Sequence, residues 1–363
     1  MSAGATRRLG VGRALVGGTW VPGDVTIDAA GRVQDVGRSP AGGGHRVAVP
    51  GFVDLQLNGA FGTDVVGADP DALEDLARRL GVHGVVAFAP TSYSAPLDGH
   101  LAVLDAVRRV RERPEVGDRV LAAHLEGPFL ASRWAGAHDP GHLRPPDPEV
   151  LRRLLDAGPV GMVTLAPELP GALELVASAA ARGVVVAVGH TDAVAAQVRA
   201  ALDAGATFLT HAFNAHRRFG ARDPGPVGVG LTDARCRVGL IADGHHLAPE
   251  TLRLVLAAAG ERTVVVSDAV APAGLPDGAA VLRGRSVAVA AGRVELPDGT
   301  LAGSATLLDG ALRHLLTIGV EPAVAVGTLS TAPARLAGLG PHDLRPGSPA
   351  RAVVLDDRWE VVS

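Results

Sequence analysis

From residue 50 onward, short apolar runs alternate with longer segments in which apolar residues recur at helical spacing. Eight runs have the composition of buried strands: Phe52–Leu57, Val85–Ala89, Val120–Leu125, Met162–Leu165, Val184–Val188, Thr207–Thr210, Val238–Ile241 and Thr263–Ser267. The intervening segments predict helices: Asp71–Leu80, Leu97–Arg111, Pro148–Asp156, Ala172–Arg182, Ala193–Asp203, Pro249–Ala258 and Ala305–Leu316. Eight strand–helix units with buried strands favour a (β/α)8 TIM barrel over an open sheet.

The two ends of the chain have a different pattern. Short β-like pieces punctuated by glycine and proline occur at Gly10–Val16, Asp24–Asp28, Arg32–Val36, Arg46–Val49, Ala350–Asp356 and Trp359–Val362. We therefore predict a small β-sandwich-like domain built from residues 1–49 and 341–363, flanking a barrel of residues 50–340. Before the last helix, three hairpin-like pieces interrupt the barrel pattern: Val281–Leu282, Val287–Ala290 and Val294–Leu296.

Chemically capable residues gather at the carboxyl ends of the predicted strands, where barrels of this type place their chemistry. Glu126 ends the third strand, and Gly127-Pro128 stops that strand at once. His190 and His211 end the fifth and sixth strands. A single strand-end histidine is often a hydrogen-bonded structural group. One carboxylate and two imidazoles together instead suit Zn²⁺ or a similar divalent ion.

Two further residues are candidates for the reaction chemistry. Asp268 ends the eighth strand and is a candidate general base and acid. The alternative is an aspartate that caps the loop beginning at Ala269. His138, in the loop after the third strand, is a candidate donor to a carbonyl oxygen that gains charge. A surface-loop histidine is an equally good interpretation of His138 from sequence alone.

The segment after the sixth strand carries candidate anion ligands. Arg222 is the best of them, and Asn214-Ala215 offers an amide and a backbone N–H. His245-His246 adds imidazoles at the end of the seventh strand. The neighbouring Arg217-Arg218 pair is less specific and is also typical of a solvated face.

Composition excludes several classes. The net charge of −4, without basic blocks, gives no support for nucleic-acid or membrane-surface binding. No apolar run reaches membrane-spanning length, and the lone Cys236 forbids an intrachain disulfide, so we expect a cytoplasmic protein. All 34 basic residues are arginine. A lysine Schiff base, a P-loop lysine and a carboxylated lysine between two metals are therefore impossible.

Several short motifs occur in a specific order: Pro50–Gly59, His124–Phe129, Gly136–His138, Gly189–Thr191, Thr210–Ala215, Ala242–His246, Ser267–Ala269 and Leu301–Ser304. Over nearly the whole chain this order resembles the N-acetylglucosamine-6-phosphate deacetylase family of the amidohydrolase superfamily. The resemblance implies hydrolysis of N-acetyl-D-glucosamine 6-phosphate to D-glucosamine 6-phosphate and acetate. Alternatives are N-acetylgalactosamine 6-phosphate, another N-acyl substrate such as an N-acyl amino acid, or a catalytically silent sugar-phosphate-binding regulator.

The resemblance also implies residue roles. Glu126, His190 and His211 match the metal ligands, Asp268 the catalytic acid and base, and His138 the group that contacts the acetamide. The substrate-binding positions are Ala137, His138, Asn214, Ala215, Arg222, His246, Leu301, Ala302 and Gly303. The last three match a loop that closes over the sugar. Family members are typically homodimers, which implies that Arg222 reaches the neighbouring subunit's site.

The sequence departs from the expected pattern in two respects. Many members carry two histidines after the first strand and bind a second metal, whereas this chain has Gln56 and Asn58. Amides are poor ligands beside a carboxylate and imidazoles, so we predict one divalent ion per subunit, with Zn²⁺ favoured. His216 stands where the family usually has methionine, and it is a candidate extra ligand.

Overall fold

The computed structural model describes residues 6–39, 44–93 and 95–362, and it is dominated by a parallel sheet of eight strands. In sheet order the strands are β7 (Phe52–Leu57), β10 (Val85–Tyr93), β11 (Ala123–Glu126), β12 (Val160–Leu165), β13 (Val185–Val188), β14 (Phe208–Leu209), β15 (Arg237–Ile241) and β16 (Thr263–Val266). The first and last strands meet beyond their ends, where the Asp268 amide donates to the Gln56 carbonyl at 3.0 Å and the Asn58 amide to the Ala269 carbonyl at 2.8 Å. The predicted (β/α)8 barrel is confirmed.

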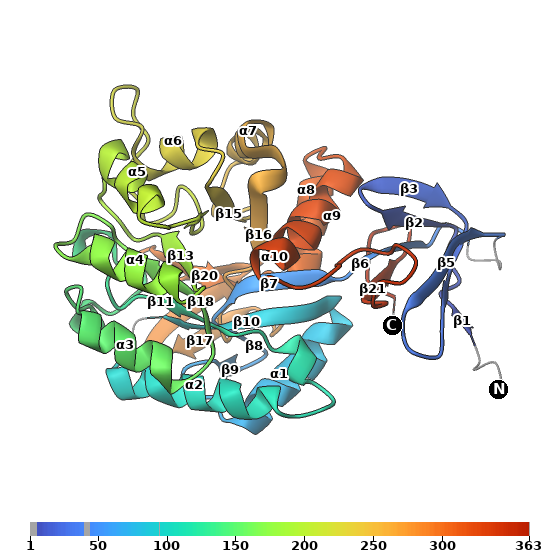
Figure 1. The fold of residues 1–363 in the computed structure, drawn as a ribbon, viewed down its shortest axis with the longest axis horizontal. Helices are drawn as coiled ribbons and strands as arrows, with labels where there is room; N and C mark the ends of the chain where they lie inside the picture. Colours follow the sequence, from blue (N-terminus) through green and yellow to red (C-terminus); the bar gives the residue numbers. More distant parts are fainter. Residues whose placement is uncertain (1–5, 40–43, 94, 363) are drawn as a thin grey trace.

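Helices cover the outside of this barrel (Figure 1). They are α1 (Pro70–Val82), α2 (Leu97–Arg111), α3 (Pro148–Ala157), α4 (Ala172–Ala181), α5 (Ala195–Asp203), α6 (Gly225–Thr232), α7 (Pro249–Ala259), α8 (Leu308–Thr317) and α9 (Pro322–Leu329). The short helix α10 (Thr331–Leu336) packs instead with the second set of strand residues, which includes Val53 and Val264. In the part of the chain that the structure describes, none of these helices is both long and apolar enough to cross a membrane.

Helices α6, α9 and α10 were missed from sequence. Helix α6 contains glycines that argue against a helix, yet they serve packing. A Cβ at Gly228 would lie 2.2 Å from the Pro224 Cβ, and one at Gly230 would lie 2.8 Å from Leu209 Cδ2. At Gly230 the helix can approach β14 only because a side chain is absent, and Gly228 leaves room for Pro224 at the start of the same helix.

Strands from both chain ends share one sheet, in the order β21 (Ala352–Leu355), β6 (Val47–Pro50), β2 (Arg13–Val16) and β3 (Thr19–Pro22). A second sheet holds β1 (Arg7–Arg8), β4 (Asp24–Ile27) and β5 (Val33–Arg38). The expected strand at Trp359–Val362 is wrong, because only a single bridge between Leu355 and Val361 forms there. The domain boundaries at residues 49 and 341 stay a prediction, and residues 1–5, 40–43 and 363 of those ranges lie outside the described chain.

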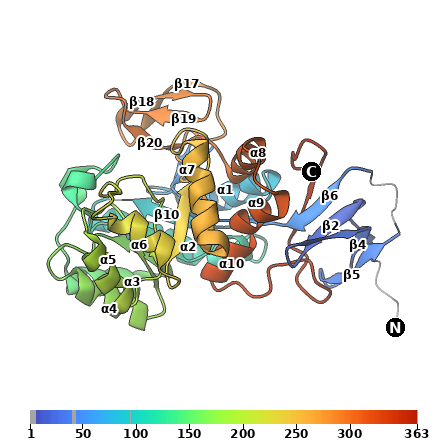
Figure 2. The ribbon, with the colours of Figure 1, turned by 90° about the horizontal axis from the view of Figure 1, so that it is seen from above.

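A separate antiparallel sheet stands over one end of the barrel (Figure 2). It contains β17 (Gly278–Leu282), β18 (Arg285–Ala290), β19 (Arg293–Glu295) and β20 (Leu301–Ser304). The last strand returns to the barrel rim, where the Ser304 amide donates to the Asp268 carbonyl at 3.0 Å. The segment Leu301–Gly303, expected to be a loop, is therefore part of a strand. A short ribbon of β8 (Gly59–Ala60) and β9 (Thr63–Asp64) lies after β7.

The layer between helices and barrel is the main stabilising core, and Leu104 of α2 is fully buried in it. We expect Leu104→Ala to lower the free energy of unfolding by about 2–5 kcal/mol, because it removes apolar contacts and leaves a cavity. Urea titration followed by circular dichroism measures the change. Leu254→Ala on α7 is the matched control, since Leu254 is 55% exposed and its loss should cost no more than about 0.5 kcal/mol. Equal effects of the two substitutions would contradict this assignment of the core.

Candidate metal centre and its cavity

Three site residues follow their strands in a left-handed backbone conformation. The φ angles are 48° at His190, 24° at His211 and 49° at Asp268. This region is rare for residues other than glycine, and strain of about 1–3 kcal/mol per residue is typically tolerated at functional sites. The turns after β13 and β14 bring the side chains of His190 and His211 to Glu126, the last residue of β11.

The side chains of Glu126, His190 and His211 converge to a compact group. Oε1 of Glu126 lies 3.2 Å from Nε2 of His190 and 3.0 Å from Nε2 of His211. The two Nε2 atoms lie 3.2 Å apart. Ligand atoms that surround one ion at about 2.0–2.1 Å have this spacing. The oxygen and two nitrogens therefore fit a divalent metal ion.

His190 has a second partner that orients its ring. Its Nδ1 lies 2.8 Å from the carbonyl oxygen of Trp134, at the end of a 3₁₀ turn, Ser132–Trp134. Donation from Nδ1 to this carbonyl fixes the ring with Nε2 directed at Glu126 and His211. The Trp134 indole N–H in turn donates to Asp192 at 2.9 Å. Outer partners of this kind are usual for histidines that bind metals.

His138 belongs to the same cluster. Its ligand atom lies within 4.8 Å of those of Glu126 and His190. Its Nε2, however, is 3.7 Å from Glu126 Oε2, farther than the distances that join Glu126, His190 and His211. Burial and the nearby His190 hold the pKa of His138 well below its usual value, so the ring is neutral. The longer distance favours His138 as a hydrogen-bond donor at the edge of the cluster rather than as a ligand.

The charge of Glu126 depends on this environment. Burial opposes ionisation, but hydrogen bonds from His190 and His211 hold the pKa of Glu126 well below its usual value. A buried carboxylate at this position therefore stays ionised, as a metal ligand must be.

Two amides hold Asp268 beside the cluster. Its Oδ1 accepts hydrogen bonds from Asn58 Nδ2 at 2.8 Å and from Gln56 Nε2 at 3.0 Å. Gln56 Nε2 also lies 2.9 Å from Glu126 Oε1, so one amide bridges both carboxylates. Burial and the charge of Glu126 raise the pKa of Asp268 to about 6. The carboxylate is thus ionised near neutral pH and still basic enough to accept a proton.

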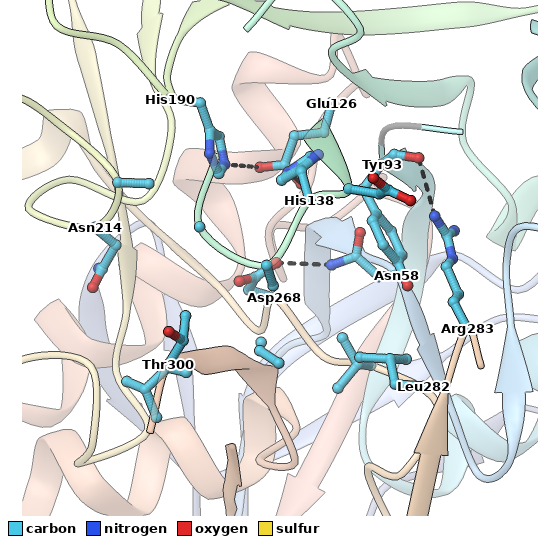
Figure 3. A pocket seen from close by; sticks show the side chains of 18 of the residues that line it. Asn58, Tyr93, Glu126, His138, His190, Asn214, Asp268, Leu282, Arg283 and Thr300 are labelled. Atoms are coloured by element: carbon cyan, nitrogen blue, oxygen red, sulfur yellow. Dashed lines mark hydrogen bonds and ion pairs between the residues drawn. The ribbon is translucent and has the colours of Figure 1, made fainter. Parts of the chain in front are cut away.

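A cavity of about 590 Å³ opens in front of these groups (Figure 3). It brings together most of the residues singled out from sequence: Asn58, Glu126, Ala137, His138, His190, His211, Asn214, Ala215, His246, Asp268, Leu301, Ala302 and Gly303. His246 is held by a hydrogen bond between its Nδ1 and Asp243 Oδ2 at 2.8 Å. His216 is buried near His211, with ring centroids 5.9 Å apart, but it does not line the cavity.

Arg222 lies elsewhere, on the wall of an adjoining cavity that shares Arg133 and Trp134 with the first. Within the described chain, it is therefore not placed beside Asp268.

Several residues that line the first cavity were missed from sequence: Tyr93, Arg133, Trp134, Arg283, Arg285 and Thr300. No local pattern identifies them, because they reach the site only through the folding of the loops and of the added antiparallel sheet.

The arrangement has close counterparts among known proteins. No family model matches the chain. Human N-acetylglucosamine-6-phosphate deacetylase is 38% identical over 378 residues, covering 96% of this chain and 90% of the human one. N-acetylgalactosamine-6-phosphate deacetylase from Escherichia coli is 38% identical over 317 residues, covering 86% and 84% of the two chains.

A solved structure from Mycobacterium smegmatis shares the whole fold. It is an N-acetyl-D-glucosamine-6-phosphate deacetylase in complex with N-acetyl-D-glucosamine-6-phosphate, with a TM-score of 0.91, 34% identity and coverage of 99% and 97% of the two chains. The chain belongs to the N-acetylglucosamine-6-phosphate deacetylase family. In this member of the family, the candidate metal centre lies at the carboxyl ends of the barrel strands, as the sequence predicted.

We expect Glu126→Gln to lower the affinity of this deacetylase-family chain for divalent metal by at least about ten-fold, because the amide cannot supply the anionic oxygen between two imidazoles. Elemental analysis after equilibrium dialysis against Zn²⁺ measures the bound metal. Glu168→Gln is the control. Its carboxylate accepts from the Thr191 hydroxyl and, at 2.6 Å, from the Asp192 amide, so it is engaged outside the cluster. Undiminished metal binding by the Glu126 variant would contradict the assignment.

Proposed function

We propose that the chain hydrolyses the amide of N-acetyl-D-glucosamine 6-phosphate and releases D-glucosamine 6-phosphate and acetate. The observation that carries this proposal is the position of the Asp268 carboxylate, which Gln56 ties to Glu126 at the edge of a cluster suited to metal. The homologues named for this reaction support the substrate class. We further propose one ion per subunit, Zn²⁺, held by Glu126, His190 and His211.

A bound divalent ion supplies Lewis-acid polarisation of an acyl carbonyl and lowers the pKa of water. The chain supplies the rest. Asp268 Oδ2 accepts a proton from the attacking water, while its Oδ1 is occupied by Gln56 and Asn58. The neutral His138 ring donates to the carbonyl oxygen as that atom gains charge. Protonated Asp268 then gives its proton to the departing amine, which completes the hydrolysis.

The sugar-phosphate end of the cavity is assigned to Asn214, Ala215 and His246, with the β20 segment Leu301–Gly303 above the sugar. We propose that the chain forms a homodimer in which Arg222 serves the neighbouring subunit's site. Its place in an adjoining cavity, outside the one that holds Asp268, supports this assignment. We also propose a cytoplasmic location, consistent with a single, buried, unpaired cysteine, Cys236.

The galactosamine epimer is a second candidate substrate. The Escherichia coli relative named for N-acetylgalactosamine 6-phosphate is as similar, at 38%, as the human enzyme named for the glucosamine compound. The two sugars differ at one hydroxyl, so the same hydrolytic groups serve both.

The first test measures acetate release from both epimers by protein treated with a chelator, with and without added Zn²⁺. We expect no turnover after chelation and recovery on adding the metal, with one epimer favoured. Asp268→Asn should lose at least about a hundred-fold in kcat, the usual scale of a lost acid–base group, while it keeps its metal. Full activity without metal, or normal turnover by the Asp268 variant, would overturn the proposed mechanism.

A second test addresses Arg222. We expect Arg222→Ala and Asp268→Asn each to be nearly inactive at low substrate concentration. When their subunits are mixed and exchanged, a site that combines Asp268 of one protomer with Arg222 of its partner is intact, which restores about a quarter of the sites in a two-fold dimer. Native mass spectrometry confirms subunit exchange. If exchange occurs without recovery, Arg222 acts within its own subunit or not at all.

A further inference from the structure

The turn between β17 and β18 contains a residue that is unfavourable for its backbone conformation. Arg283 and Gly284 form a two-residue turn with φ angles of 48° and 75°. Turns with two left-handed residues favour asparagine followed by glycine, because most side chains are strained there. An arginine at the first position therefore needs compensation from contacts outside the hairpin.

Those contacts come from two segments that precede Arg283 by about two hundred residues in sequence. Arg283 Nε and Nη2 lie 3.1 Å from Oδ2 and Oδ1 of Asp64 on β9, a two-point ion pair. Nη1 donates to the Tyr93 carbonyl at 3.2 Å, and Cζ lies 3.1 Å from the centre of the Tyr93 ring. The side chains of the ion pair are only 22% and 21% exposed, so water weakens it less than it weakens a surface pair.

We call the Arg283–Asp64 ion pair the latch. Through Tyr93 it is connected to His138 in the candidate site. The Tyr93 ring lies edge-on to His138, with ring centroids 5.8 Å apart. Leu282, the residue before Arg283, lines the cavity together with Val66, Ala95 and Pro96. The hairpin tip thus contributes an apolar wall and holds the aromatic ring that packs on His138.

The cavity has two chemically different ends. Figure 3 shows Asn214 and Thr300 on one side of Asp268, and Leu282, Tyr93 and Arg283 on the opposite side. The first end is polar and is the one assigned above to the sugar phosphate. A substrate whose phosphate lies there, and whose amide lies at Asp268 and His138, directs its acyl chain toward the second end, whose wall includes the apolar side chain of Leu282 and the ring of Tyr93.

We propose that Leu282, Tyr93 and the Arg283–Asp64 latch form the acyl subsite, and that Arg283 is a positioning residue that sets the permitted length of the N-acyl group. This proposal rests on the proposed deacylase function. With the latch closed, the wall of the subsite is fixed and longer acyl groups are disfavoured. When the latch is broken, the hairpin tip is free to move away and the subsite lengthens.

The test compares kcat/KM for N-acetyl-, N-propionyl- and N-butyrylglucosamine 6-phosphate. The variant is Arg283→Asn, which places the favoured Asn-Gly pair in the turn and so keeps the hairpin while removing the latch. One methylene in a fitted apolar pocket changes kcat/KM by about 10–200-fold. We expect the acetyl-to-propionyl ratio to fall by about ten-fold in the variant, with a larger change for butyryl.

Asp64→Asn provides a second variant that breaks the ion pair from the barrel side, and it should shift the ratio in the same direction. Arg293→Ala is the control, because Arg293 pairs with Glu295 in the same antiparallel sheet without lining the cavity. An equal loss on all three substrates in both variants would show a merely structural role and overturn the proposal. If the wild type releases acetate but the acetyl-to-propionyl ratio of kcat/KM is unchanged in the variants, the proposed acyl subsite is wrong and the proposed function stands. Failure of the wild type on every substrate refutes the proposed function as well.

Discussion

The buried carboxylate of Glu126 is the group on which the arrangement of the site depends. A buried charge at the end of an apolar strand is costly unless several hydrogen-bond donors surround it. Here the donors come from other strands: His190 after β13, His211 after β14 and Gln56 on β7. Each donor reaches Glu126 only if its own strand ends at the same height along the barrel axis as β11. The requirement to compensate one charge therefore fixes the relative heights of four strand ends, and it makes the same atoms available to a metal ion.

The contacts that close the barrel also position Asp268, the proposed base. Asp268 donates its backbone N–H to Gln56 across the β7–β16 seam, while its side chain accepts from the side chain of the same glutamine. Its carbonyl also accepts from Ser304 of β20. The left-handed backbone at Asp268 is held by these contacts from both sides. A change at the junction of β7 and β16 would therefore move the Asp268 carboxylate, the proposed catalytic base, as well as destabilise the fold.

The sequence permitted prediction of those parts whose signal is local. Buried strands appear as apolar runs, and a polar residue directly after such a run must lie at a strand end, which is how Glu126, His190, His211 and Asp268 were found. Helix α6 was missed because Gly228 and Gly230 have low helix propensity and are required there by close packing. Arg283 was missed for a related reason. Its partners Asp64 and Tyr93 are remote in sequence, and the residue itself is unfavourable in its own turn.

The amides at Gln56 and Asn58 support the proposal of a single ion per subunit. Two ionised carboxylates, Glu126 and Asp268, approach the same amide nitrogen and would repel each other without it. A second cation between them would neutralise that repulsion, but it would also hold Asp268 as a ligand and depress its pKa. A neutral amide supplies only a dipole. It orients Asp268 without adding a charge. Burial and the charge of Glu126 raise the pKa of Asp268 to about 6, a value suited to the proposed group that accepts and then returns a proton near neutral pH. An amide on β7 in place of an imidazole therefore supplies a hydrogen bond to the proposed base, Asp268, where a histidine would supply a second metal ligand.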